Sequence, residues 1–292
     1  MSVPMRLLLG LPAPAKINLF LHVIGRRDDG YHEIQSAFHP VGLYDRLDFE
    51  RLERARIERT GDLAGPVEED LAVRAARLLQ SRHAPGAGAT IAVRKSIPVG
   101  SGLGGGSSDA ATTLIALDRL WGLGLGRDRL RELGLELGAD VPFFLGRGPA
   151  FVEGIGERCT PLAPDPRVAL VVYPQVAVST AEIFRDRELT RNSKPTTISG
   201  FSAAMAASGG RLFGANDLEP VARRRTPQVG HALDLLARHG EARMSGSGSS
   251  VFRLCGDLRE AESLAGAVRR DAPAAWQVWA LPLLDELPLA VW

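Results

Sequence analysis

The stretch PVGSGLGGGSSDAA, residues 98–111, constrains what this chain can fold into more than any other. Five of its fourteen residues are glycine and three are serine, so it has few side chains to offer a packed core. Yet the strand-like segment ATIAVRKSIP leads into it, and the apolar run TTLIALDRLWGL follows it directly. The apolar side chains of that run recur at helical spacing, at Ala110, Leu114, Leu117 and Trp121. This spacing predicts a helix from Ser107 onward.

A glycine loop between a strand and a helix N-terminus is, physically, an anion-binding site. Glycines let backbone N–H groups approach an oxyanion closely, and the start of a helix presents unpaired donors at the positive end of its dipole. Ser101, Ser107 and Ser108 add hydroxyl groups that can donate to phosphate or ligate a cation. Asp109 suits the first helical turn electrostatically, and we expect it to point outward. The alternative is a surface linker, but linkers rarely join an apolar helix without a spacer.

Two named phosphate-binding motifs do not fit this loop. GSGLGG, residues 100–105, formally matches the dinucleotide pattern G-x-G-x-x-G. That pattern also requires an acidic residue about 20 positions on, at the end of a second strand. Near residue 125 the sequence reads LGRDRLREL, which predicts a helix. The Walker pattern fails because no lysine follows the glycines. The sequence therefore indicates a phosphate loop of a third kind.

Composition and charge narrow the class of protein. The 292 residues suit one large domain or two ordinary ones, and an apolar fraction of 45% allows a sizeable core. With 35 basic and 34 acidic residues, the chain gives no electrostatic case for binding nucleic acid or a membrane surface. We interpret the arginines at 223–225 as a solvated helix face. Histidines and cysteines are scattered and predict no structural metal site.

The cysteines and the N-terminal residues indicate a cytoplasmic protein. Cys159 and Cys255 lie far apart and form no partner motif, which is a weak sign of a reducing compartment. The apolar run LLLGL is followed at once by Pro12 and Pro14, so it is too short for a spanning helix and unlike a signal peptide.

Hydrophobic periodicity predicts strands and helices in mixed order, which favours the α+β class over a doubly wound sheet. Expected strands cover 16–25, 44–52, 89–98, 167–174, 249–254 and 276–281, and expected helices cover 68–82, 127–138, 226–240 and 257–271 besides the one after the glycine loop. The run RVALVVYP (167–174) is apolar throughout and is expected to be a central strand. A shift in composition at 153–166 marks the candidate domain boundary, whereas the segment 185–210 has no clear pattern.

Three stretches resemble the GHMP kinase superfamily. Pro98, GLGGGSS (102–108) and the alanine pair that follows resemble its phosphate-binding motif. PAPAKINLFLHVIGRRDDGYHEIQS (12–36) resembles its N-terminal motif, and RMSGSGSSVF (243–252) resembles its C-terminal glycine motif. Within the superfamily, DGYHE, LGADVPFFL and NDLEP are most similar to the members that act on a cytidine-diphosphate-linked methylerythritol. The matches keep the family's order over most of the chain.

The resemblance implies a fold, a reaction and two small-molecule substrates, ATP and the group acceptor. The fold would join an ATP-binding domain over residues 1–158, similar to the second domain of ribosomal protein S5, to a ferredoxin-like substrate-binding domain over residues 159–292. The reaction would be ATP-dependent phosphorylation of the 2-hydroxyl of the cytidine-diphosphate-linked methylerythritol, a step of the non-mevalonate isoprenoid pathway. ATP chemistry in turn implies Mg²⁺. Its protein ligands are unknown, with Ser108 as one candidate, and a monomer and a homodimer both remain open.

Two residues carry the expected chemistry. Asp140 follows the helix-ending Gly138 and precedes Val141 and Pro142, so its carboxylate is well placed to project into a cleft. The resemblance makes Asp140 the general base that takes the hydroxyl proton. It makes Lys16 the cation that keeps the base ionised and stabilises charge during phosphoryl transfer. The alternatives are a helix-capping or ion-paired aspartate and a solvated lysine at a strand end.

The remaining candidate residues would bind the two ligands. The resemblance assigns ATP to the loop residues Pro98, Val99, Gly100, Ser101, Gly102, Leu103, Gly104, Gly105, Gly106, Ser107 and Ser108. Lys95, which closes the strand before the loop, is a further candidate for the nucleotide pocket. Asn18, two positions after Lys16 and hence on the same strand face, would bind the methylerythritol hydroxyls. Tyr31 and Phe184 would stack on the cytosine ring, with His32 at its edge and Thr180 nearby. The alternative for Phe184 is a core position. The serines of 245–250 resemble the motif that shapes the substrate phosphate pocket, and the alternative there is a glycine hairpin turn.

Other functions fit fewer of these features. Another GHMP kinase, acting on mevalonate or homoserine, would not explain DGYH together with LGADVPFF. A nicotinamide oxidoreductase rests on GSGLGG alone. A nucleotide-binding module without activity would leave Lys16 and Asp140 without a purpose.

Overall fold

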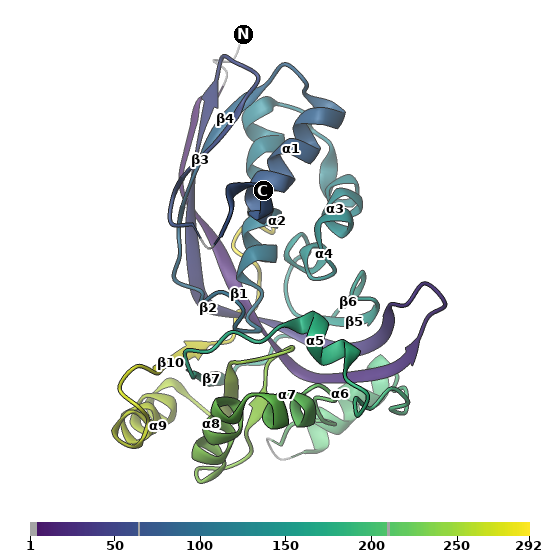
Figure 1. Cartoon of the computed structure of the whole chain (residues 1–292), viewed down its shortest axis with the longest axis vertical. Coiled ribbons are helices and arrows are strands. Elements are labelled where there is room, and N and C mark those ends of the chain that lie inside the picture. Colours follow the sequence, from purple (N-terminus) through teal and green to yellow (C-terminus); the bar gives the residue numbers. More distant parts are fainter. Residues whose placement is uncertain (1–4, 64, 209–210) are drawn as a thin grey trace.

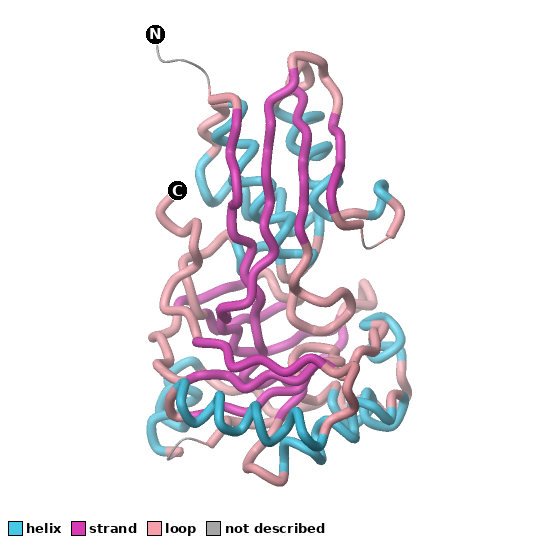
Figure 2. Tube along the Cα trace, turned by 90° about the vertical axis from the view of Figure 1, so that its left-hand side faces the viewer, coloured by secondary structure: helices cyan, strands magenta, loops and turns pink. Residues whose placement is uncertain are grey.

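The computed structural model describes residues 5–63, 65–208 and 211–292. The molecule is elongated and has two halves, each built on one sheet with helices against it (Figure 1). The sheet of the N-terminal half has the strand order β3-β4-β2-β5-β6, with β1 paired to β2, and that of the C-terminal half has the order β10-β7-β9-β8. In Figure 2 the long strands of the first sheet stand upright, and those of the second lie across below them. The mixture of strands and helices is the predicted α+β class.

The elements of the N-terminal half come first in the chain. Its strands are β1 (Leu7–Arg26), β2 (His32–Leu52), β3 (Ile57–Gly61), β4 (Gly88–Arg94), β5 (Ala150–Gly154) and β6 (Arg158–Pro161). Its helices are the 3₁₀ turn η1 (Val67–Glu69), α1 (Leu71–His83), α2 (Gly105–Trp121), α3 (Gly126–Leu137) and α4 (Val141–Phe144).

The C-terminal half contains the other elements. Its strands are β7 (Val168–Tyr173), β8 (Arg243–Met244), β9 (Val251–Cys255) and β10 (Gln277–Pro282). Its helices are α5 (Thr180–Arg185), α6 (Ile198–Ala207), α7 (Glu219–Arg225), α8 (Pro227–Ala237) and α9 (Leu258–Asp271). The segment 185–210, which has no clear sequence pattern, thus contains α6.

The strands β1 and β2 form one long antiparallel hairpin that runs through both halves (Figure 1). The predicted strands 16–25 and 44–52 are only parts of it, because β1 begins at Leu7 and β2 at His32. Register shifts interrupt the pairing at four places, and such bulges let long strands bend and twist. Residues of β1 belong to all three hydrophobic clusters: Leu11 to that of the N-terminal half, Leu21 to that of the C-terminal half, and Ile17 to the one between them.

Helices α1, α2 and α3 pack on one face of the first sheet (Figure 1). The N-cap of α1 is Asp70, whose side chain accepts a hydrogen bond from the backbone of Ala72, and basic residues close its last turn. Nearly the whole circumference of α2 is buried, including all four of the apolar residues that predicted it. The indole of Trp121 at its end donates to the carbonyl of Gly88 on β4. The glycine loop therefore leads into the most deeply buried helix of this half.

The strand β7 is central in the second sheet, as its continuous apolar sequence predicts. Its residues alternate between two cores: Leu170 and Val172 pack towards α7, α8 and α9, whereas Val171 faces the first sheet. Because both faces are covered, every residue of the strand is buried.

Four phenylalanine rings meet where the two halves join. Phe20 of β1 lies with its ring centroid 5.9 Å from that of Phe151 on β5, 5.3 Å from that of Phe201 on α6 and 5.0 Å from that of Phe213. The segment after β10 then returns to the N-terminal half, where Leu287 and Leu289 enter its core. A division at 158/159 falls at the start of β6, which pairs with β5 in the first sheet, and it remains a prediction.

No helix in the described ranges is long and apolar enough to cross a membrane.

We expect Phe20→Ala to lower the free energy of unfolding by about 3–5 kcal/mol, because it empties a fully buried site at the junction of the halves. Val291→Ala is the matched control, since its side chain is 75% exposed and its loss is expected to change stability by less than about 0.5 kcal/mol. Urea denaturation of both variants measures the difference, and equal midpoints would contradict the role assigned to Phe20.

Candidate active site

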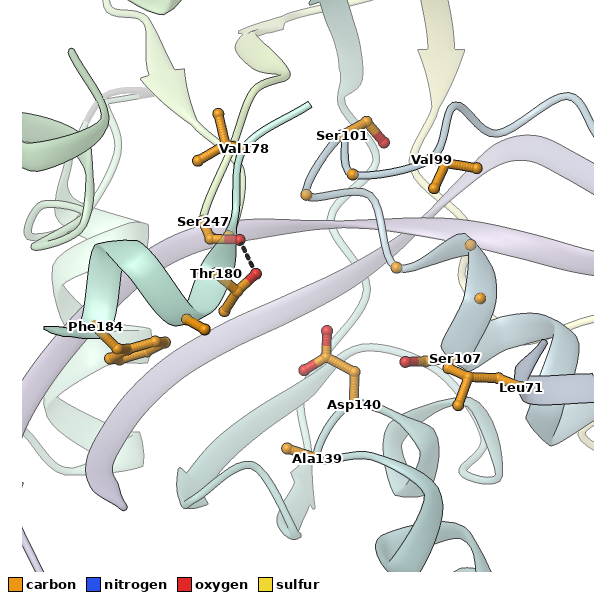
Figure 3. A pocket seen from close by; sticks show the side chains of 18 of the residues that line it. Leu71, Val99, Ser101, Ser107, Ala139, Asp140, Val178, Thr180, Phe184 and Ser247 are labelled. Atoms are coloured by element: carbon orange, nitrogen blue, oxygen red, sulfur yellow. Dashed lines mark hydrogen bonds between the residues drawn. The ribbon is translucent and has the colours of Figure 1, made fainter. Parts of the chain in front are cut away.

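A cavity of about 1230 Å³ lies where the glycine loop, the β1–β2 hairpin and α5 converge. In Figure 3, Leu71, Val99 and Ser107 lie on one side of the cavity, Asp140 in the middle, and Thr180, Ser247 and Phe184 on the other side. Lys95 also lines the cavity, as do Lys16 beside Asp140 and His32 beside Phe184. Pockets for one small ligand usually measure about 300–1,000 Å³. The cavity therefore has room for two ligands that meet near its middle.

The glycine loop leads into the first turn of α2, which begins at Gly105, two residues before the predicted start. Its N-cap is Gly104, which has no side chain to accept from the first helical N–H groups. The N–H groups of Gly105, Gly106 and Ser107 have no acceptor within the described part of the chain. All three residues line the cavity. Unpaired donors at the N-terminus of a 17-residue helix are the geometry that the sequence predicts for an anion site.

The loop packs tightly against the C-terminal glycine motif. At Gly102, φ is +77°, and a Cβ atom there would lie 2.2 Å from the carbonyl oxygen of Ser245. The hydroxyl of Ser245 donates to the carbonyl of Gly102 at 3.1 Å, and the N–H of Ser250 donates to that of Ser101 at 2.9 Å. Only glycine fits at position 102, and the two halves hold the loop between them.

A buried ion cluster holds both ends of the loop. Asp45 of β2 accepts from the backbone N–H groups of Ser96 and Ile97, at 2.6 and 2.9 Å. The ammonium group of Lys95 donates to Asp45 and also to Asp109 in the first turn of α2, the latter at 2.6 Å. The expectation that Asp109 points outward is wrong, because the residue is only 5% exposed. Burial raises the pKa of Asp109 to about 7, against the opposing charge of Lys95.

Lys16 and Asn18 project from the same face of β1, as their spacing predicts. The ammonium group of Lys16 donates to the side-chain oxygen of Asn18 at 2.6 Å and lies 3.4 Å from a carboxylate oxygen of Asp140. Asn18 donates in turn to the hydroxyl of Ser36 on β2 at 3.0 Å. Both Lys16 and Asn18 are buried, so the ammonium charge lies among fixed partners at the bottom of the cavity.

Asp140 occupies the N-cap position of α4, but its side chain accepts no capping hydrogen bond. Its side chain is 31% exposed, and its carboxylate points into the cavity between Ser107 and Thr180 (Figure 3). The helix-capping interpretation therefore fails, whereas the ion pair with Lys16 is present. A carboxylate that is paired with a cation but open to the cavity is placed to accept a proton from a bound hydroxyl.

The far end of the cavity brings together the residues predicted to bind a cytosine ring. The rings of His32 and Phe184 have centroids 5.0 Å apart, and Tyr31 is 60% exposed on the cavity wall. Thr180 shares a hydrogen bond of 2.6 Å with the hydroxyl of Ser247. Phe184 also packs against the core of the C-terminal half, so its two interpretations are compatible. Burial and the neighbouring charges of Arg191 and Arg26 lower the pKa of His32.

The cavity wall includes all the predicted site residues but two. Leu103 and Ser108 lie behind the wall, and both are fully buried. The backbone carbonyl of Leu103 accepts from the N–H of Lys16, which ties the loop to β1. The hydroxyl of Ser108 has no partner among the described residues. No group of three or more potential metal-ligating side chains occurs in the described ranges.

Sequence reasoning missed Asp45 and Arg191. Asp45 comes from a strand segment with no motif, and Arg191 lies in the unassigned segment 185–210. Neither has a local motif: Asp45 binds Lys95, 50 positions away, and Arg191 reaches His32, 159 positions away.

Comparison with known proteins identifies a family. Residues 70–148 match the family model of the GHMP kinases N terminal domain, and residues 196–274 match that of the GHMP kinases C terminal domain. A protein of Janthinobacterium sp. (strain Marseille), 4-diphosphocytidyl-2-C-methyl-D-erythritol kinase, is 49% identical over 285 residues, which cover 96% of each chain. The protein of the same name from Methylibium petroleiphilum is 50% identical over 286 residues, which cover 98% of each.

Solved structures agree with this similarity. The crystal structure of a 4-(cytidine 5'-diphospho)-2C-methyl-D-erythritol kinase has a TM-score of 0.78 at 38% identity, over 94% of this chain and 98% of that one. Homoserine kinase from Cytophaga hutchinsonii has a TM-score of 0.75 at 18% identity, over 98% of each chain, which is a likeness of fold alone.

We expect Gly102→Ala to weaken ATP use strongly, because a Cβ atom there would displace the loop from Ser245. Gly124→Ala is the matched control: Gly124 also has a positive φ, +64°, but a Cβ atom there would meet nothing within 4 Å. Both variants therefore carry backbone strain, and only the first moves the loop. Steady-state kinetics should give a raised KM for ATP in Gly102→Ala alone; similar values in both variants would contradict the packing argument.

Proposed function

The chain belongs to the GHMP kinase family, and on that premise we propose that it transfers the γ-phosphoryl group of ATP to the 2-hydroxyl of 4-diphosphocytidyl-2-C-methyl-D-erythritol. This reaction belongs to the non-mevalonate route to isoprenoid precursors. One observation carries the proposal beyond family likeness: the Lys16–Asp140 pair lies between a phosphate loop and an aromatic end within one cavity. Such an arrangement lets two ligands meet at a base and a cation.

The ATP end follows from the loop and its surroundings. We propose that the triphosphate lies along residues 98–107, where the free N–H groups of the first turn of α2 bind its oxygens. Val99, an apolar side chain that is largely exposed on the cavity wall, and Leu71 would flank the adenine ring (Figure 3). Lys95 would mainly hold the loop in place and not bind the phosphates directly, because its ammonium group is already bound by Asp45 and Asp109.

In the reaction itself, Asp140 would accept the proton of the 2-hydroxyl as that oxygen attacks the γ-phosphorus. Lys16 would stabilise the negative charge that builds up on the transferred group, and Asn18 would orient the methylerythritol hydroxyls. Because Asn18 and Ser36 hold the lysine in place, the ammonium group needs little reorganisation when the ligands bind.

A magnesium ion would neutralise charge on the β- and γ-phosphates of ATP. The residues present fit a cation that is held mainly by the phosphates, since Mg²⁺ usually takes few protein ligands at such sites. The hydroxyl of Ser107, which lies on the cavity wall in the first turn of α2, is the protein ligand we propose. The candidate Ser108 is less suitable, because it is fully buried behind that wall. Asp45 and Asp109 are less suitable, because Lys95 occupies both.

We also propose that the enzyme acts in the cytoplasm, where ATP is abundant and free cysteines such as Cys159 and Cys255 remain reduced. Its partners would be the two small-molecule substrates and not nucleic acid, given a net charge of +1. Release of ADP in the presence of the cytidine substrate, mevalonate or homoserine tests the function directly, and turnover of mevalonate or homoserine instead would refute it.

We expect Asp140→Asn to reduce kcat by about 10²–10⁴-fold, because an amide cannot accept the hydroxyl proton. ATP affinity, measured by calorimetry, should stay unchanged. Asp128→Asn is the control, since that carboxylate lies on α3 with its side chain 95% exposed. Unchanged turnover in Asp140→Asn would exclude Asp140 as the base.

Tyr31→Ala should raise the KM for the cytidine substrate by about 5–150-fold, which corresponds to the 1–3 kcal/mol of one base–aromatic stack. The KM for ATP should not change, because Tyr31 lies at the far end of the cavity from the loop. Tyr31→Phe keeps the ring and should behave like the wild type. Equal losses for both substrates in Tyr31→Ala would contradict the stacking role.

A further inference from the structure

Arg191 joins the two sides of the aromatic end of the cavity. One terminal nitrogen of its guanidinium donates to the carbonyls of Phe184 and Asp186, at 3.1 and 2.6 Å, and the other donates to that of Leu189 at 3.1 Å. Its Nε donates to Nε2 of His32 at 3.1 Å. A single side chain thus binds both the ring at the start of β2 and the backbone at the end of α5.

These contacts fix the protonation of the His32 ring. An arginine Nε–H group is always a donor, so the Nε2 atom that faces it must be an unprotonated acceptor. A neutral imidazole then carries its proton on Nδ1. Burial and the positive charges of Arg191 and Arg26 lower the pKa of His32, which favours this neutral form. In the described part of the chain Nδ1 has no partner, so it is the ring nitrogen left for a ligand.

We propose that Arg191 is a positioning residue that holds His32 in its Nδ1–H tautomer and thereby makes the site select cytosine over uracil. The inference rests on the proposed function, in which His32 contacts the edge of the base. Cytosine presents an acceptor at N3, whereas uracil presents an N–H donor at the same place. An Nδ1–H group of His32 can donate to N3 of cytosine, whereas with uracil it faces another N–H donor. A donor that is buried against a donor costs free energy, so uracil is disfavoured.

The same guanidinium also sets the width of the base site. It binds the carbonyl of Phe184, whose ring lies 5.0 Å from that of His32 at an interplanar angle of 31°. The stacking ring and the hydrogen-bonding ring are therefore held by one charged group. Substitution of Arg191 should affect recognition of the base and leave the loop, Lys16 and Asp140 unchanged.

The tautomer can be measured without any ligand. In ¹⁵N-histidine-labelled enzyme, long-range ¹H–¹⁵N spectra distinguish Nδ1–H from Nε2–H, and His32→Gln assigns the signal among the six histidines. We expect the Nδ1–H pattern in the wild type and a gain of the Nε2–H form in Arg191→Ala. Arg187→Ala removes an exposed arginine of the same segment and should keep the wild-type pattern.

Kinetics then test selectivity. The ratio of kcat/KM for the cytidine substrate to that for its uridine counterpart should fall about tenfold or more in Arg191→Ala, with the KM for ATP unchanged. Arg191→Lys keeps a positive charge, but its single nitrogen cannot serve His32 and three carbonyls at once. Arg191→Lys should lower the cytidine-to-uridine ratio by a smaller factor than Arg191→Ala. If Arg191→Ala does not fold, the ratio measured for Arg191→Lys tests the role of Arg191. Arg187→Ala should match the wild type.

The outcomes separate this inference from the function on which it rests. A wild-type tautomer and an unchanged cytidine-to-uridine ratio in both Arg191 variants would overturn the role of Arg191. A wild-type enzyme that does not phosphorylate the cytidine substrate would instead overturn the proposed function. A fall in the ratio with the ATP KM and the thermal midpoint unchanged would support the inference, since a purely structural role would lower stability and leave the ratio alone.

Discussion

The antiparallel pairing of β1 with β2 is the interaction on which the rest of the structure depends. The pair extends through both halves of the molecule, and its residues enter all three hydrophobic clusters. Lys16 and Asn18 lie near the middle of β1, where the two halves meet, while His32 begins β2 and Asp45 lies near its far end. One ladder of backbone hydrogen bonds therefore fixes the spacing between the two ends of the cavity.

Buried charges in this enzyme are paired, and the pairs connect segments that are far apart in the chain. Lys95 is bound by carboxylates from β2 and α2, and Lys16 by a carboxylate that precedes α4. Removing one partner of a buried pair typically costs about 3–5 kcal/mol, because the other charge is left without compensation. The glycine loop, which has few side chains of its own, is thus held in shape by charged groups around it. Its backbone donors remain free for a ligand.

The site was predictable where a role depends on local sequence. The glycine loop predicts a helix N-terminus with open donors, and the spacing of Lys16 and Asn18 predicts that they share a strand face; both features are present. The outward orientation of Asp109 was wrong because helix electrostatics alone gave no information on Lys95 and Asp45, which draw the carboxylate inward. The roles of the individual site residues remain proposals, tested by the variants described.

By itself the sequence determined the strongly periodic elements, such as α2 and β7, and the open donors of the glycine loop, because periodicity and glycine conformation act over a few neighbouring residues. It also determined the family, through motifs whose order along the chain is preserved. It did not determine α6 or the full length of β1 and β2. Only the tertiary structure decided which charges pair and which ring nitrogen of His32 faces Arg191. Asp45 is 50 positions from Lys95, and Arg191 is 159 positions from His32. Contacts over such separations depend on how the strands and helices pack, and a local pattern in the chain contains no record of that packing.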